Sequence, residues 1–86
     1  MDEIPKLRKK VDAVDDQILR AISERVSVCK AIGDAKKKQG MPIKDTSREN
    51  QVYKRIKEKS AQFQLDPVQI ERVYREIVNM CSAVQE

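Results

Sequence analysis

The chain has 86 residues, of which 37% are charged and 3% aromatic, with a formal net charge of +4 and no histidine. This length fits one domain, and the scarcity of aromatic residues, glycine and proline favours helices over strands, so we expect an all-α fold. No segment approaches the roughly 18 consecutive apolar residues of a membrane span, and without a signal peptide we expect a cytoplasmic protein.

The residue types also exclude several kinds of site. Cys29 and Cys81 are far apart and have no histidine to join them, so no zinc site is expected. With Gly33 and Gly40 as the only glycines, no Gly-rich nucleotide-binding loop is possible. The basic runs are short and interleaved with acids, which favours solvated helix faces over a nucleic-acid surface. Any chemistry is expected to proceed without metal or cofactor.

The first predicted helix covers residues 3 to 37. Pro5 falls in its first turn, where the missing N–H costs little, and Gly40 with Pro42 ends it. Apolar side chains recur along it in steps of three and four, at Ile4, Leu7, Val11, Val14, Ile18, Ile22, Val26, Cys29 and Ile32.

The second predicted helix covers about residues 46 to 61. Thr46 and Glu49 match a capping box, and Asp45 is a competing N-cap. Its inward stripe consists of Glu49, Val52, Tyr53, Ile56 and Ser60. We expect a connector over residues 61 to 65.

The third predicted helix covers about residues 67 to 85, with Asp66 as its cap and Pro67 at its first position. Its stripe consists of Ile70, Val73, Tyr74, Ile77, Val78, Cys81, Val84 and Gln85.

The length of the first helix predicts a dimer. About 35 helical residues extend roughly 52 Å, whereas a compact domain of this size is only about 30 Å across. The two shorter helices cannot cover the whole apolar stripe, and the remainder would be a self-complementary surface. We therefore expect an intertwined homodimer in which the first helix runs antiparallel to its copy.

Polar side chains lie on the inward face of each helix. Arg25 and Lys36 are eleven residues apart, close to three turns, and point the same way. Glu49 and Gln85 bring a carboxylate and an amide onto the other inward faces. Each residue taken alone has a simpler explanation. The long side chains of Arg25 and Lys36 could extend to the surface, Glu49 could be the capping-box partner of Thr46, and Gln85 could lie at a frayed helix end. Together they predict a pocket for a small polyanion that carries a hydroxyl.

Arg8 lies 17 residues before Arg25, so about 25 Å separates them along one helix. Two such residues cannot hold one small ligand from the same chain. In an antiparallel dimer they can, and the site would then be shared between subunits.

Three segments carry a resemblance to a known family. "LRKKVDAVDDQIL", "ERVSVCKAIGDAK" and "PIKDTSRENQV", which has the form P-x-x-D-x-x-R-E, closely resemble the all-helical chorismate mutases, over about residues 7 to 85. These are small dimeric isomerases of aromatic amino acid biosynthesis. The resemblance implies a cofactor-free Claisen rearrangement of chorismate to prephenate.

The resemblance also implies roles for individual residues. Arg25 and Arg8 of the partner subunit would hold the substrate carboxylates, and Lys36 and Gln85 would donate to the ether oxygen. Glu49 would accept from the ring hydroxyl with the backbone at Asp45, Arg48 would add positive charge, and Ile32 would form an apolar wall. Cys81 stands where relatives often carry a serine that touches a carboxylate. Ser82 lies about 100° around the helix and is not expected to replace it.

Two other functions fit the same pattern. The first is an isochorismate pyruvate lyase, which resembles this fold and carries out a related pericyclic reaction. The second is a noncatalytic helical module for dimerisation or ligand sensing that retains the pocket. The products formed from chorismate and isochorismate would distinguish the three.

Overall fold

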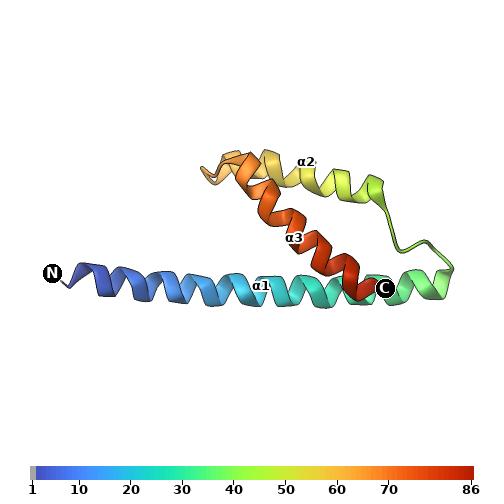
Figure 1. The fold of residues 1–86 in the computed structure, drawn as a ribbon, viewed down its shortest axis with the longest axis horizontal. Coiled ribbons are helices and arrows are strands. Elements are labelled where there is room, and N and C mark those ends of the chain that lie inside the picture. The colour runs from blue at the N-terminus through green and yellow to red at the C-terminus, as the bar shows by residue number, and fades with distance from the viewer. Residues whose placement is uncertain (1) are drawn as a thin grey trace.

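The computed structural model describes residues 2–86, and every regular element in this range is an α-helix (Figure 1). The helices are α1 (Glu3–Gln39), α2 (Thr46–Gln62) and α3 (Pro67–Gln85). Their bounds agree with the predicted spans to within about two residues, and the all-α prediction is confirmed. Met1, the first residue of the predicted domain of residues 1–86, lies outside the described residues.

The carboxyl end of α1 is fixed by Gly40. Its φ of 68° is left-handed, which a residue without Cβ adopts at little cost. The amide of Gly40 donates to the carbonyl of Lys37, and that of Met41 to the carbonyl of Lys36 at 2.8 Å. This pair of bonds is a Schellman motif, which ends the helix and turns the chain toward α2.

Two N-terminal caps were predicted for α2, Asp45 and a capping box of Thr46 and Glu49, and only the first is present. The Asp45 side chain accepts a hydrogen bond from the Arg48 amide at 2.9 Å, so Asp45 is the N-cap. The capping box of Thr46 and Glu49 is wrong, because Glu49 instead forms an ion pair with Lys44 at 2.9 Å. The Glu49 carboxylate is thereby left outside the capping bonds of the helix.

The connector between α2 and α3 is shorter than predicted, because α2 continues to Gln62. The amide of Leu65 donates to the carbonyl of Ser60 and that of Gln64 to Ala61, a second Schellman pattern. Its left-handed position is occupied by Gln64, with a φ of 60°. Asp66 then caps α3 by accepting from the Val68 amide, as predicted.

Helix α3 lies diagonally between α1 and α2 and packs against both (Figure 1). The buried side chains come mainly from α2 and α3 and comprise Tyr53, Ile56, Ser60, Val78 and Cys81. An ion pair between Lys57 and Glu71 links α2 to α3, and the hydrogen bond from Lys57 lowers the pKa of the Glu71 carboxyl. The core is small, which agrees with a domain that has little apolar surface to bury by itself.

The chain is elongated, because α1 extends well past the other two helices (Figure 1). The structure measures 60 × 23 × 16 Å and its radius of gyration is 16.3 Å, against about 12 Å for a compact domain of this length. Every described residue before Ile22 is exposed. These include the apolar residues Ile4, Leu7, Val11, Val14 and Ile18. Among residues 2–86 no helix is long and apolar enough to cross a membrane.

Candidate active site

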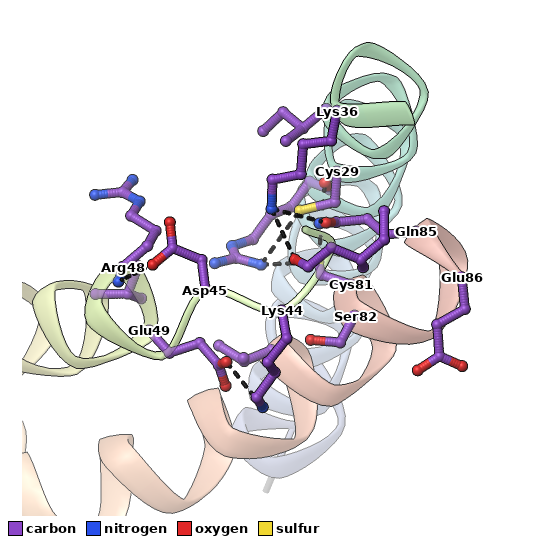
Figure 2. Close-up of a pocket in the computed structure, with 15 residues that line it drawn as sticks. Cys29, Lys36, Lys44, Asp45, Arg48, Glu49, Cys81, Ser82, Gln85 and Glu86 are labelled. Atoms are coloured by element: carbon purple, nitrogen blue, oxygen red, sulfur yellow. Dashed lines mark hydrogen bonds and ion pairs between the residues drawn. The ribbon is translucent and has the colours of Figure 1, made fainter. Parts of the chain in front are cut away.

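A cavity of about 250 Å³ lies where the second half of α1, the loop before α2 and the end of α3 meet. Figure 2 shows its polar side chains converging from these segments. Eight of the nine residues predicted for the site line it: Arg25, Ile32, Lys36, Asp45, Arg48, Glu49, Cys81 and Gln85. The fold therefore brings together residues separated by up to 60 positions in the sequence.

Arg25 faces sulfur atoms. Its Nη1 donates to Cys81 Sγ at 2.8 Å and to Cys29 Sγ at 3.8 Å, and its guanidinium lies 6.0 Å from the centre of the Tyr74 ring. Burial raises the pKa of the Cys29 thiol, and the neighbouring Cys81 side chain adds to this effect. The Cys29 thiol is therefore neutral at pH 7 and supplies no counter-charge to Arg25.

Lys36 lies on the same helix as Arg25, eleven residues further along α1. Its Nζ donates to the Ile43 carbonyl at 2.9 Å and to Gln85 Oε1 at 3.2 Å (Figure 2). An ammonium has three N–H bonds and no acceptor, so one donor remains beyond these two contacts. Because Gln85 uses its oxygen toward Lys36, its NH₂ group is left to face another acceptor.

The other rim of the cavity is the start of α2. Glu49 is half-buried there and is paired with the exposed Lys44 (Figure 2). The Asp45 side chain caps α2 through Oδ1, and its backbone carbonyl accepts a hydrogen bond from the Glu49 amide at 3.1 Å. This rim offers the Glu49 carboxylate as an acceptor, opposite the two cations.

In the part of the chain that the structure describes, neither Arg25 nor Lys36 forms an ion pair with a carboxylate. The ion pairs found among residues 2–86 are Lys44 with Glu49, Lys57 with Glu71 and Arg75 with Glu71. Partly buried cations without a counter-charge are costly, and an anionic ligand would relieve that cost. Over the same residues, no group of three or more His, Cys, Asp or Glu side chains could hold a metal ion.

The cavity also includes residues that the sequence analysis did not assign: Cys29, Ile43, Lys44, Val52, Val78, Ser82 and Glu86. Cys29, Val52 and Val78 belong to the predicted stripes, which pointed to their inward faces. Ile43 and Lys44 lie in a loop, where periodicity gives no signal. Ser82 is half-buried and lines the cavity despite its angle from Cys81 (Figure 2).

Arg8 is the one predicted site residue that does not line this cavity. It is exposed on the first third of α1, far along the helix from Arg25. Its assignment depends on a second chain and stays a prediction.

Comparison with known proteins gives relatives along the whole chain. A bifunctional chorismate mutase/prephenate dehydratase of Aquifex aeolicus is 33% identical over 89 residues, covering 100% of this chain and 25% of the relative. A chorismate mutase of Methanocaldococcus jannaschii is 35% identical over 66 residues, covering 77% of this chain and 67% of the relative. The chain thus spans a quarter of the first relative and about two thirds of the second.

A solved structure has the same fold. A conserved hypothetical protein from Pyrococcus furiosus superposes with a TM-score of 0.75 at 24% identity, covering 100% of this chain and 99% of that one. Residues 7–86 match the family described as chorismate mutase type II. The three helices, the cavity between them and this match lead to one conclusion: the chain belongs to the type II chorismate mutase family.

Proposed function

We propose that the chain is an isomerase that rearranges chorismate to prephenate, in the pathway to phenylalanine and tyrosine. The observation that carries the proposal is the pair of cations on the cavity wall, Arg25 and Lys36, neither of which is paired with a carboxylate of residues 2–86. Chorismate is a dicarboxylate with a ring hydroxyl and an ether oxygen, and the cavity offers Arg25 for one carboxylate, Glu49 for the hydroxyl and Lys36 for the ether oxygen. A pericyclic rearrangement needs no nucleophile, base or metal.

Lys36 and Gln85 are proposed to stabilise the transition state. As the ether bond breaks, negative charge develops on its oxygen, and fixed donors favour this state over the ground state. The third N–H of Lys36 and the NH₂ group of Gln85 supply two such donors. The bonds from Lys36 to Ile43 and Gln85 hold both groups in place before substrate binds.

The remaining residues are proposed to fold the substrate into its reactive shape. Arg25 binds one carboxylate, and its contact with Cys81 orients the guanidinium. Glu49 and the backbone at Asp45 accept from the ring hydroxyl, while Arg48 adds positive charge. Ile32 provides an apolar wall against the substrate, and Cys81 adds a weak donor toward a carboxylate. Fixing both ends in this way removes much of the entropic cost of the reaction.

We further propose that the active form is an antiparallel, intertwined homodimer. The accessible surface is 7200 Å², roughly 2,000 Å² above the value for a compact monomer of this mass. The apolar face of α1 between Ile4 and Ile18 accounts for part of this excess. An antiparallel copy would cover it and bring Arg8 of the partner subunit near the cavity, as a ligand for the second carboxylate.

The proposed compartment is the cytoplasm. Cys29 and Cys81 are both free thiols, which agrees with a reducing environment.

The test is an assay of the purified chain with chorismate, following the loss of its absorbance and identifying the product by chromatography. We expect prephenate. A chain with both Arg25→Ala and Lys36→Ala, purified in the same way, controls for a contaminating enzyme. Salicylate and pyruvate formed efficiently from isochorismate would instead support a lyase. Conversion of neither substrate would support a noncatalytic module.

A further inference from the structure

Gly33 is the only buried residue of α1. It faces the last turn of α3, and a Cβ added to it would lie 2.8 Å from Gln85 Cα, 2.8 Å from Gln85 Cγ and 2.9 Å from Gln85 Cβ. Contacts this short do not occur between real carbon atoms, and one of the three is to backbone. The two helices can approach at this point only because position 33 has no side chain.

This close approach lies beside the proposed donors. Lys36 is one helical turn beyond Gly33 on the same face of α1, and Gln85 is the last residue of α3. The bond from Lys36 Nζ to Gln85 Oε1, at 3.2 Å, is already near the upper limit for a hydrogen bond. A small increase in the separation of the two helices would therefore break it.

We infer that Gly33 is a positioning residue, whose lack of a side chain sets the distance at which Gln85 meets Lys36. This inference rests on the proposed function for its effect on turnover, but the geometry on which it depends is independent of any substrate. An alanine at position 33 needs Gln85 Cα to move by at least about 0.6 Å to reach an ordinary contact of 3.4 Å. The backbone of α3 has to move with it.

Gly33→Ala displaces the end of α3, but it should stabilise α1 itself. Alanine has the highest helix propensity and glycine one of the lowest, so α1 itself becomes more stable. A loss of turnover in this variant can therefore not be attributed to a weakened α1. It would follow from the displaced end of α3.

A double-mutant cycle tests the inference. We expect Gly33→Ala to lower kcat at least about tenfold, with KM changed less than about threefold, because one transition-state donor is misplaced. In a Gln85→Ala background the same substitution should change kcat less than about twofold, because that donor is already absent. Asp34→Ala, at an exposed neighbouring position, is the matched control and should retain normal turnover.

Equal losses in both backgrounds would overturn the inference, because Gly33 would then act on the site by a route other than Gln85. Unchanged kcat in Gly33→Ala, or loss of its helical circular dichroism, would overturn it as well. The second result would make position 33 a requirement for folding.

An NMR measurement separates this inference from the proposed function. In ¹⁵N-labelled protein we expect the side-chain amide resonances of Gln85 in Gly33→Ala to move toward their positions in Lys36→Ala, since both variants lose the same hydrogen bond. Wild-type resonances in Gly33→Ala would overturn the inference. If the wild-type chain does not convert chorismate, the proposed function fails and this comparison still decides the role of Gly33.

Discussion

At the level of single residues, the site places two cations beside sulfur, carbonyl and amide acceptors. Arg25 contacts sulfur atoms, and Lys36 contacts a carbonyl and an amide oxygen. The carbonyl and amide oxygens satisfy N–H groups of Lys36 without supplying a counter-charge. Evolution of a purely structural core would favour apolar side chains at these positions, since they pack at lower cost.

The first prediction concerns Lys36. Lys36→Ala should lower kcat at least about a hundredfold, because removing one donor to a developing oxyanion typically costs about 2.7 to 4 kcal/mol of barrier. Steady-state kinetics with chorismate provides the measurement. Lys38→Ala, which removes an exposed cation outside the cavity, is the control for net charge. Turnover of Lys36→Ala within a few-fold of wild type would remove Lys36 from the mechanism.

The second prediction concerns Arg25. Arg25→Met should abolish most turnover, while the free energy of unfolding stays equal or rises by about 1 kcal/mol, because an uncompensated, partly buried charge is replaced by an apolar chain. Urea unfolding at a fixed protein concentration measures the second quantity. A loss of more than about 3 kcal/mol would show instead that Arg25 is part of a structural interaction.

At the level of the helices, local signals in the sequence were sufficient for most of the fold. The steps of three and four, with Pro67 and Gly40 as boundaries, located all three helices. Two caps were available for α2, and sequence alone could not rank Asp45 above the box formed with Glu49, because their energies are similar. Only the folded chain, in which Lys44 pairs with Glu49, separates them.

The sequence contained no comparable signal for the distances between helices. Periodicity placed Arg25, Lys36, Glu49 and Gln85 on inward faces, whereas Asp45 and Arg48 were assigned through the P-x-x-D-x-x-R-E resemblance, and all six line the cavity. The approach of Gly33 to Gln85 depends on where two helices cross, and the entry of Ser82 into the cavity depends on the rotation of α3. Periodicity describes one helix at a time and contains neither quantity.

The third prediction concerns the end of α2. Gln64→Gly should raise the free energy of unfolding by about 1 kcal/mol, because Gln64 occupies a left-handed position, with φ 60°, that penalises a Cβ. Gln51→Gly, in the exposed middle of α2, is the matched control and should lower it by a similar amount. Destabilisation by both substitutions would mean that the left-handed geometry at residue 64 is absent in solution.

At the level of the whole molecule, the exposed half of α1 links folding to function. It displays Leu7, Val11, Val14 and Ile18 to solvent in a single chain, and Arg8 lies on the same segment. If a second copy covers this face, the contact that completes the core also supplies the second arginine. Stability and turnover would then depend on protein concentration together.

The final prediction tests this shared site with inactive chains. When Arg8→Ala and Arg25→Ala chains are mixed and allowed to exchange, each heterodimer contains one site with both arginines and one with neither. Random exchange makes half the dimers mixed, so about a quarter of wild-type turnover should return. Native mass spectrometry verifies exchange. Mixing Arg25→Ala with Lys36→Ala is the matched control and should restore nothing, because both residues of each site come from one chain. No recovery in the first mixture after verified exchange would place Arg8 outside a shared site.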